Sequence, residues 1–421
     1  MNAWVPITLG ELCDRGGGVV RTGPFGSQLH QKDYSDVGTP VVMPQDLIDG
    51  RVSEASIARI SDEHVRRLSQ HQLKIGDIVY GRRGDIGRRA FITEREEGWL
   101  CGTGCLRISP GVGAVNSRFL FYALGEPRTV EGIAKKAVGA TMPNLNTTIL
   151  REVPLLLPTP PEQERIASIL GAYDDLIEIN RKRIALLEEM ARRLFEEWFV
   201  CFRYPGHQSD TSKSSVPRGW TTTAIRELGR VVTGKTPSKA NPDFFGGTIP
   251  FIKIPDMHAC KFVLSTDDRL SSAGANSQSS KLIPPGSLCV SCIGTIGLVA
   301  ITTEPSQTNQ QINSIILDRE HLREFLFFSL GAAKIALQNL GSTGATMGNV
   351  SKDKFEKLAL LLPEDSLLHH YHELVAPMFN GMLRYSRMTN ALAASRDHIL
   401  PRVISGEFSI STAERELEAV A

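Results

Sequence analysis

One stretch of this sequence occurs twice, and it decides how the chain is organised. It reads GDIVYGRRGDIG at residues 76–87 and GSLCVSCIGTIG at residues 286–297. Three other stretches recur in the same order, at offsets between 205 and 211 residues. A repeat of this length is the size of a whole domain, so it predicts two tandem copies of one globular unit rather than a solenoid. The other pairs are TGPFGS at 22–27 with TGKTPS at 233–238, GATMPN at 139–144 with GATMGN at 344–349, and VPLLLP at 153–158 with LALLLP at 358–363.

Each copy contains short apolar runs that glycine and proline interrupt. Runs such as 77–80 in the first copy and 288–291 in the second have the length and punctuation of β-strands. Gly84 and Gly87 predict a tight turn between two strands, and both glycines recur in the second copy. The expected fold class is therefore α+β, with two tandem mixed α/β domains. Helices are expected at residues 116–124 and 320–340.

Each copy ends in a long segment whose sequence pattern predicts a single helix. After Pro160 and Pro161, apolar residues recur at spacings of three and four as far as Trp198, which is typical of a coiled-coil seam. A helix of about 40 residues is roughly 60 Å long, too long for one small domain to cover. We therefore expect the two helices to pack on each other, antiparallel. The expected helix-pair interface comprises Ile166, Leu170, Tyr173, Ile177, Asn180, Ile184, Leu187, Leu194 and Trp198 in the first helix, and Tyr371, Val375, Met382, Tyr385, Leu392 and Ile399 in the second.

The second helix has a less regular pattern than the first. Thr389 and Arg396 interrupt its apolar stripe, and Pro377 and Gly381 are expected to bend its first half. The polar Asn180 at a seam position of the first helix would fix the register of the pair at some cost in stability.

These patterns predict six segments along the chain. They are an N-terminal domain at 1–157, a first long helix at 158–202, a linker at 203–216, a C-terminal domain at 217–362, a second long helix at 363–404 and a tail at 405–421.

Composition excludes several classes of protein. The 421 residues include 47 Lys and Arg against 46 Asp and Glu, so the net charge of +1 neither requires nor excludes a nucleic-acid partner. An apolar share of 41% excludes disorder as the main state. No apolar run approaches the ~18 residues of a membrane span, and no secretory signal is expected from the first residues.

Three local patterns resemble known chemical motifs without meeting their requirements. Gly229–Thr236 satisfies GxxxxGK[ST], but a phosphate-binding loop must lead into a helix and Pro237 follows at once. Asn241–Phe244 reads NPDF, which lacks the second proline of the catalytic loop of adenine methyltransferases. Cys289 and Cys292 form one CxxC without a second pair, so we expect buried thiols in a reducing cytoplasm and no metal site.

Short motifs at the openings and ends of the two copies resemble one family. The openings are residues 22–29 with 38–42, and 233–238 with 246–253. The first long helix is entered through PTPPEQERIA at 158–167, and the second is left through LPRVISGEF at 400–408. Together with the repeated layout, these motifs resemble the specificity (S) subunits of Type I restriction–modification systems over nearly the whole chain. The second helix entry departs from the pattern, because PEDSL at 363–367 lacks the Pro-Pro-x-Glu-Gln run.

The resemblance implies a function and a set of partners. In that family each domain is a target-recognition domain that reads one half of a split DNA sequence. The helices set the spacing of the halves and recruit two methyltransferase (M) subunits, and restriction (R) subunits join the complex. The S subunit is not an enzyme, so S-adenosylmethionine, ATP and Mg²⁺ are expected on the partner subunits and no cofactor on this chain. Double-stranded DNA in a prokaryotic cytoplasm is the expected target, with no membrane partner.

Donor-rich loops supply the candidate DNA contacts. Four arginines flank the repeated glycine turn, and such a concentration of guanidinium groups is costly without an anion nearby. Amides and hydroxyls in the other repeated loops can read bases or stabilise turns. The predicted contacts are Gln28, Lys32, Arg82, Arg83, Arg88, Arg89 and Asn144 in the first copy, and Lys235, Ser238, Lys239, Lys253 and Asn349 in the second.

Two alternatives remain open at this point. A regulatory relative would bind partner subunits without reading DNA, and substitution of Arg82 and Arg83 would then leave its effect unchanged. A P-loop NTPase would bind nucleotide through Lys235.

Overall fold

The computed structural model describes residues 4–137, 144–206, 216–342 and 348–407, together with residues 412, 413, 415 and 417. The chain divides into two compact units. Unit 1 comprises Met1–Glu178 with Thr389–Ala421, and unit 2 comprises Ile179–Met388. Each unit therefore contains one sequence repeat and a part of both long helices.

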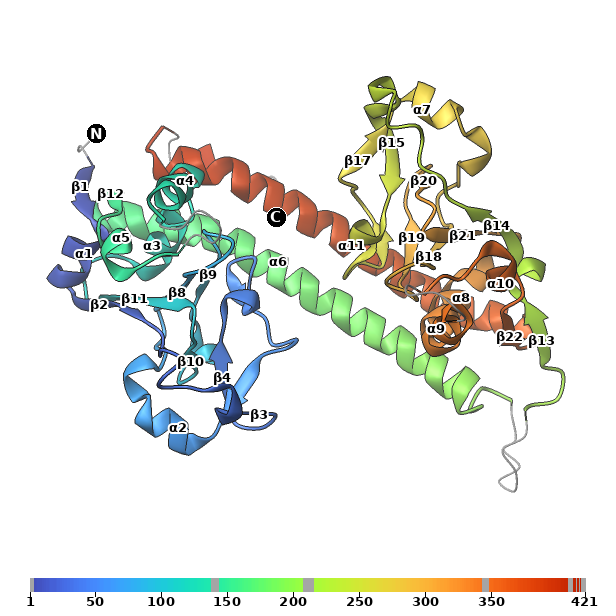
Figure 1. Cartoon of the computed structure of the whole chain (residues 1–421), viewed down its shortest axis with the longest axis horizontal. Helices are drawn as coiled ribbons and strands as arrows, with labels where there is room; N and C mark the ends of the chain where they lie inside the picture. The colour runs from blue at the N-terminus through green and yellow to red at the C-terminus, as the bar shows by residue number, and fades with distance from the viewer. Residues whose placement is uncertain are drawn as a thin grey trace. The chain divides into compact units, whose positions relative to one another are not determined.

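Unit 1 is built on two four-stranded sheets (Figure 1). The first is antiparallel in the order β2-β11-β8-β9, and the second has the order β10-β4-β7-β3 with β10 parallel to β4. A separate pair, β1 with β12, joins the start of the repeat to its end, with Val5 opposite Leu157. The strands are β1 Val5–Thr8, β2 Gly17–Thr22, β3 Tyr34–Ser35, β4 Thr39–Val42, β5 Leu47–Ile48, β6 Arg51–Val52, β7 Ala58–Ile60, β8 Ile78–Gly81, β9 Arg89–Phe91, β10 Leu100–Cys101, β11 Cys105–Gly111 and β12 Pro154–Leu157.

Unit 2 repeats this plan, which confirms the tandem mixed α/β domains expected from the sequence. Its main sheet has the order β14-β21-β18-β19-β16, its second sheet the order β17-β15-β20, and β13 pairs with β22 as β1 pairs with β12. The strands are β13 Thr221–Ala224, β14 Gly229–Thr233, β15 Phe245–Ile252, β16 Phe262–Val263, β17 Asp268–Leu270, β18 Leu288–Ser291, β19 Val299–Thr302, β20 Gln307–Thr308, β21 Ile312–Leu317 and β22 Ala359–Leu362.

Short α-helices occur in both units, and α3, α8 and α9 lie where the sequence predicted helices. Asn116 caps α3, because its Oδ1 accepts a hydrogen bond from the Phe119 amide at 3.0 Å. The helix expected at 320–340 breaks at Ala333 into α8 and α9. The short helices are α1 Leu9–Arg15, α2 Asp62–Arg67, α3 Ser117–Ala123, α4 Pro127–Lys136, α5 Thr147–Arg151, α7 Ser272–Asn276, α8 Arg323–Ala332, α9 Lys334–Gly341 and α10 Lys352–Glu356.

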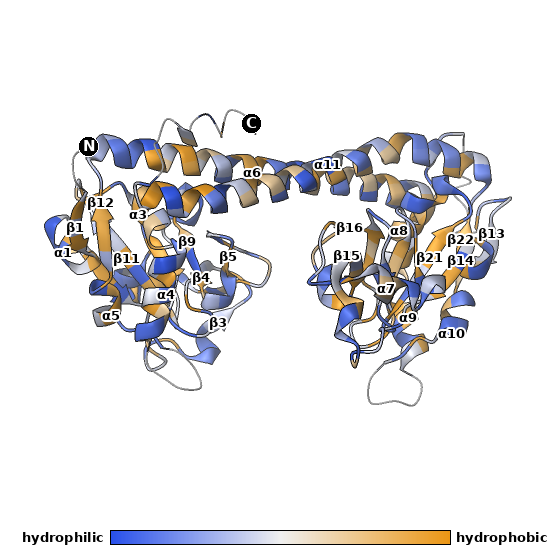
Figure 2. Cartoon of the chain, turned by 90° about the horizontal axis from the view of Figure 1, so that it is seen from above, coloured by the Kyte–Doolittle hydropathy of each residue, from blue (hydrophilic) through white to orange (hydrophobic). Residues whose placement is uncertain are grey.

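The two long helices are α6, Pro160–Phe195 with a final π turn Glu196–Val200, and α11, Asp365–Ile404. In unit 1 the beginning of α6 shares a hydrophobic core with the end of α11, and in unit 2 the end of α6 shares one with the beginning of α11. This order of contacts is that of an antiparallel pair, as expected. Figure 2 shows the helices and the apolar strands by hydropathy.

Every residue predicted for the helix-pair interface is buried or half-buried. The cores also contain the domains' own side chains, so these residues attach each domain to the helices as well as joining the helices. In unit 1 the residues are Ile166, Leu170, Tyr173, Ile177, Leu392 and Ile399, and in unit 2 they are Asn180, Ile184, Leu187, Leu194, Trp198, Tyr371, Val375, Met382 and Tyr385.

Helix α11 runs without interruption through Pro377 and Gly381. A Cβ atom on Gly381 would lie 3.0 Å from Cδ1 of Leu187, so glycine permits the close approach of α6 at this position.

The predicted tail beyond α11 contributes to the fold, because Ala413 is fully buried in the core of unit 1. Of the predicted linker, residues 207–215 lie outside the described part of the chain. Among the described helices, none combines the length and apolar character needed to cross a membrane.

Candidate nucleic-acid interface

Four loops meet at one edge of the main sheet in unit 1. Strands β2 and β8 end at this edge, while β11 and β9 begin there, because the four strands alternate in direction. The Gly23 amide donates to the Cys105 carbonyl at 2.9 Å, and the Arg82 amide donates to the Gly104 carbonyl at 2.8 Å. The Leu145 amide donates to the Arg82 carbonyl at 2.9 Å. We call this region the loop edge of unit 1; it comprises residues 23–28, 82–88, 102–104 and 144–146.

Unit 2 has the same loop edge, formed by residues 234–239, 292–297, 309–311 and 348–350. The Gly234 amide donates to the Ile312 carbonyl at 3.1 Å, and the Cys292 amide donates to the Gln311 carbonyl at 2.8 Å. The Val350 amide donates to the Cys292 carbonyl at 2.9 Å. Single β-bridges join Arg83 to Asn144 in unit 1 and Ile293 to Asn349 in unit 2. The repeated motifs of the sequence therefore converge in three dimensions.

A glycine is required at the same place in both loop edges. A Cβ atom on Gly23 would lie 2.0 Å from the Gly102 carbonyl oxygen, and one on Gly234 would lie 2.1 Å from the Asn309 carbonyl oxygen. Backbone packs directly against backbone at these positions. This close approach explains why Thr-Gly occurs at the opening of both copies.

The loop edge of unit 1 brings together most of the side chains predicted there. Arg83 is exposed, and Arg82 is half-buried, with Nε donating to the Leu145 carbonyl at 2.7 Å. The Arg82 guanidinium also lies 6.0 Å from the ring of Phe25, an exposed aromatic residue that the sequence analysis did not select. Asn144 is half-buried, and its Oδ1 has no hydrogen-bond partner among the described residues.

Two further predicted residues lie beside this group. The Gln28 side chain accepts a hydrogen bond from the Phe25 amide at 3.0 Å, so it stabilises the turn. Lys32 is exposed on the 3₁₀ turn Gln31–Asp33 that follows.

The other two arginines of the hairpin are used within the protein. Arg88 is exposed and pairs with Asp85 at 3.0 Å. Arg89 turns inward, where Nε donates to the Phe121 carbonyl at 3.0 Å and the guanidinium lies 4.7 Å from the Phe121 ring. Burial lowers the pKa of Arg89. Because its guanidinium group is used in contacts within the protein, Arg89 is not part of the DNA surface that we propose below.

In unit 2 the predicted residues also divide into two groups. Lys235, Ser238, Lys239 and Asn349 are exposed at the loop edge. Lys253 lies directly after β15 and pairs with Asp268 at 2.9 Å, and this contact raises the lysine pKa. The sequence analysis missed Gln310, whose Oε1 accepts a hydrogen bond from Thr236 at 2.8 Å. No repeated motif marks Gln310, so only its place beside Thr236 identifies it.

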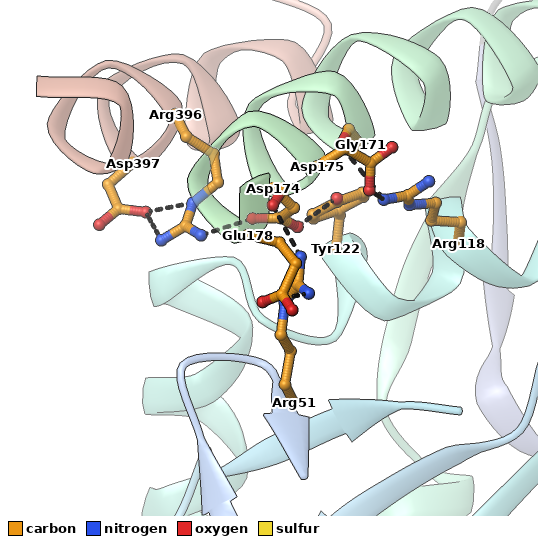
Figure 3. Close-up of polar contacts among 9 residues, drawn as sticks. All are labelled: Arg51, Arg118, Tyr122, Gly171, Asp174, Asp175, Glu178, Arg396 and Asp397. Atoms are coloured by element: carbon orange, nitrogen blue, oxygen red, sulfur yellow. Dashed lines mark hydrogen bonds and ion pairs between the residues drawn. The ribbon is translucent and has the colours of Figure 1, made fainter. Parts of the chain in front are cut away.

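A network of ion pairs fixes the domain of unit 1 on its helices (Figure 3). Asp174 of α6 is at its centre. Its Oδ1 pairs with Nη1 of Arg396 in α11 at 2.6 Å, and its Oδ2 accepts a hydrogen bond from the Tyr122 hydroxyl at 2.5 Å. Burial by itself would lower the pKa of Arg396, but Asp174 and Asp397 raise it above its usual range. Arg396, which interrupts the apolar stripe in the sequence, is therefore a paired residue.

Two arginines of the domain extend this network along α6. Arg51 donates to the Asp174 carbonyl at 2.7 Å and pairs with Glu178 at 2.8 Å. Arg118 pairs with Asp175 at 2.8 Å and donates to the Gly171 carbonyl at 3.2 Å. The name helix clasp is used below for Arg51, Arg118, Tyr122, Asp174, Asp175, Glu178 and Arg396.

The three motif-like patterns lack the structure that their chemistry needs. Gly229–Thr236 contains strand β14, and within the described residues no α-helix follows before α7 at Ser272. Asn241 caps a 3₁₀ turn that ends at Phe244. Cys289 and Cys292 point to different hydrophobic clusters, and burial raises their pKa values to about 12 and about 11. The CxxC pair therefore cannot hold one metal ion between its sulfurs.

Comparisons with known proteins agree with this architecture. Residues 1–189 and 217–366 match the family described as the Type I restriction modification DNA specificity domain. The specificity subunit of the Type I restriction enzyme HindI of Haemophilus influenzae is 32% identical over 428 residues, which cover 86% of this chain and 92% of that protein. The MjaIX specificity subunit of Methanocaldococcus jannaschii is 24% identical, over 90% of this chain and 89% of that protein.

Solved structures extend the agreement to the fold. The crystal structure of the S subunit of a Type I restriction–modification system from M. genitalium superimposes with a TM-score of 0.60 at 14% identity, covering 96% of both chains. Two repeated domains on a pair of long helices thus define a class of DNA-specificity protein. The chain belongs to the specificity subunits of Type I restriction–modification systems, which are non-catalytic.

Proposed function

We propose that this subunit reads a bipartite, asymmetric DNA target, with one half bound by the loop edge of each unit. The observation that carries the proposal is the repetition of one loop edge with different side chains. Arg82 and Arg83 stand in unit 1 where Cys292 and Ile293 stand in unit 2, whereas Asn144 and Asn349 are the same residue type. Since bases are read by side-chain donors and acceptors, unlike side chains on like scaffolds favour unlike half-sites.

Phosphate contacts are assigned to the exposed cations of the loop edges and to Lys32 beside the loop edge of unit 1. Arg83, Lys32, Lys235 and Lys239 are exposed, whereas Arg88 and Lys253 pair with carboxylates. Asn144, Ser238, Asn349 and Gln28 offer amide or hydroxyl groups for base edges. On this assignment the cations orient the duplex and the neutral polar groups contribute most of the sequence preference.

Replacing Arg83 by alanine is expected to weaken DNA binding mainly through one lost phosphate contact. The slope of log K against log salt should then become shallower by about 0.9. Fluorescence anisotropy over a series of salt concentrations measures the slope. The matched control is Arg15→Ala, because Arg15 is exposed at the opposite end of β2. An unchanged slope in Arg83→Ala would remove this residue from the DNA surface.

A stripe of exposed apolar residues on α6 favours a helical protein partner. Ile179, Leu186 and Met190 are 43%, 61% and 47% exposed, and their spacing of seven and four residues places them on one helix face. Exposed apolar stripes of this kind receive the apolar face of a partner helix. We assign the stripe to an M subunit, and infer that two such subunits and the R subunits complete the complex. S-adenosylmethionine, ATP and Mg²⁺ are assigned to these partners, in the cytoplasm of a prokaryotic cell.

Replacing Leu186 by aspartate is expected to weaken assembly with the M subunit by about tenfold or more, because the M subunit would then cover a charge in place of an apolar side chain. The matched control is Ala185→Asp, which introduces the same charge at an exposed neighbour on another face of the helix. Co-purification and analytical ultracentrifugation report the complex. Equal loss of assembly in both variants would exclude the stripe as the docking site.

A methylome tests the proposed function directly. The chain is co-expressed with the neighbouring methyltransferase gene in a host without adenine methylation, and N6-methyladenine is mapped by single-molecule sequencing. A split, asymmetric motif that vanishes when this chain is omitted is the expected result. Absence of methylation by an assembled complex would favour the regulatory alternative.

A further inference from the structure

A cluster of two histidines and one carboxylate lies in unit 2 where α11 begins, away from the loop edge. His321 belongs to the 3₁₀ turn Glu320–Leu322 before α8, while Asp365 and His369 lie one turn apart on α11. Nε2 of His321 is 3.0 Å from Oδ1 of Asp365, and Nε2 of His369 is 3.5 Å from Oδ2. All three ligand atoms lie within 4.8 Å of one another.

The spacing of these atoms suits a tetrahedral metal ion. Zn²⁺ binds imidazole nitrogen and carboxylate oxygen at about 2.0–2.2 Å, so neighbouring ligand atoms are about 3.4 Å apart. The 3.5 Å between Nε2 of His369 and Oδ2 of Asp365 is close to this value, and Nε2 of His321 lies 3.0 Å from the other carboxylate oxygen, Oδ1. The imidazole rings are stacked, with centroids 3.7 Å apart and planes inclined by 24°, and both direct Nε2 to the same carboxylate.

We propose that His321, Asp365 and His369 bind one Zn²⁺ ion that ties the 3₁₀ turn before α8 to the first turns of α11. Two imidazoles and one carboxylate are ligands that Zn²⁺ accepts, and a fourth position remains for water. The site joins the recognition domain of unit 2 to its long helix. It is a structural site, independent of the DNA contacts proposed above.

The first repeat makes the corresponding connection with hydrogen bonds. Gln163 of α6 accepts a hydrogen bond from the Asn116 amide at 2.9 Å and donates to the Pro158 carbonyl at 2.9 Å. The FLF of α3 at 119–121 recurs in α8 at 325–327, which places Leu322, the neighbour of His321, at the position of Asn116. The offset of 205 residues at the start of the long helices places Leu368 at the position of Gln163. Unit 2 thus has no glutamine for this connection, and the histidine–carboxylate cluster occupies the same junction.

One neighbouring cation opposes metal binding. Nη1 of Arg319 lies 2.6 Å from Oδ1 of Asp365. Asp365 can keep this pair through Oδ1 and bind the ion through Oδ2, which faces His369. Replacing Arg319 by alanine should therefore strengthen Zn²⁺ binding. A cluster that does not bind metal would show no such gain in affinity.

The test uses the full-length chain after treatment with EDTA and dialysis, titrated with ZnCl₂ by calorimetry. We expect one high-affinity equivalent and a rise in Tm. His369→Ala and Asp365→Asn should each lower the affinity by about tenfold or more, since even outer-shell partners contribute that much. The matched control is His370→Ala, the adjacent exposed histidine outside the cluster, which should bind as the unaltered chain does.

Two further measurements separate ligation from misfolding. The metal-free Tm of His369→Ala should equal that of the unaltered chain, because this side chain is 57% exposed. Co²⁺ should give the visible absorption of a tetrahedral site in the unaltered chain and lose it in His369→Ala. Absence of Zn²⁺ binding, or equal affinity in the His369 and His370 variants, would overturn the proposal.

Discussion

Replacing Arg396 by methionine is expected to lower the free energy of unfolding of unit 1 by about 2–4 kcal/mol. Asp174 would keep only the Tyr122 hydroxyl as a described partner of its carboxylate, because Arg51 donates to its backbone carbonyl instead. A carboxylate in a largely buried position that loses its cation is costly, while the methionine would still fill the space between the helices.

Chemical denaturation followed by hydrogen exchange in unit 1 measures this loss. The matched control is Arg95→Met, which removes an arginine from an exposed ion pair with Glu54 within unit 1 and should cost less than about 1 kcal/mol. Adding Asp174→Asn to Arg396→Met should recover part of the stability, because the unpaired charge is then removed. Equal effects of the Arg396 and Arg95 replacements would show that the helix clasp does not stabilise unit 1.

Replacing Gly23 by alanine is expected to disrupt the loop edge of unit 1 and abolish or relax recognition of one half-site. The new Cβ would lie 2.0 Å from the Gly102 carbonyl oxygen, a distance that only a backbone shift can relieve. Overpacking of this kind costs about 1–3 kcal/mol, and it would displace the loop that carries Phe25 and Gln28.

The matched control lies in the same loop. Gly26 has no atom within 4 Å of an added Cβ, so Gly26→Ala should leave the target unchanged. In the methylome, Gly23→Ala should lose methylation or accept degenerate bases in one half of the motif, and Gly234→Ala should affect the other half. Degeneracy spread over both halves in either variant would contradict the assignment of one half-site to each unit.

The tandem plan and the two long helices followed from local patterns. Residues repeated at offsets of 205 to 211 positions must build similar domains, and apolar spacing of three and four predicts α6 and α11 to within a few residues. The full or partial burial of every predicted interface residue follows from the same periodicity. The motif-like patterns were rejected for similar local reasons, since Pro237 prevents the helix that a phosphate-binding loop needs.

The roles of individual polar residues depended on contacts that sequence spacing does not encode. Arg83 and Arg89 have equivalent places in the sequence of the hairpin, yet Arg83 is exposed and Arg89 lies over the Phe121 ring. Lys253 is predicted as a DNA contact from the sequence, and only the fold places Asp268 beside it. Arg396 and Asp174 are 222 residues apart, and His321 and Asp365 are 44 apart. Hydrophobic periodicity depends on residues that are near one another along the chain. The partner of a charged side chain instead depends on which distant segments the packing of the cores brings together.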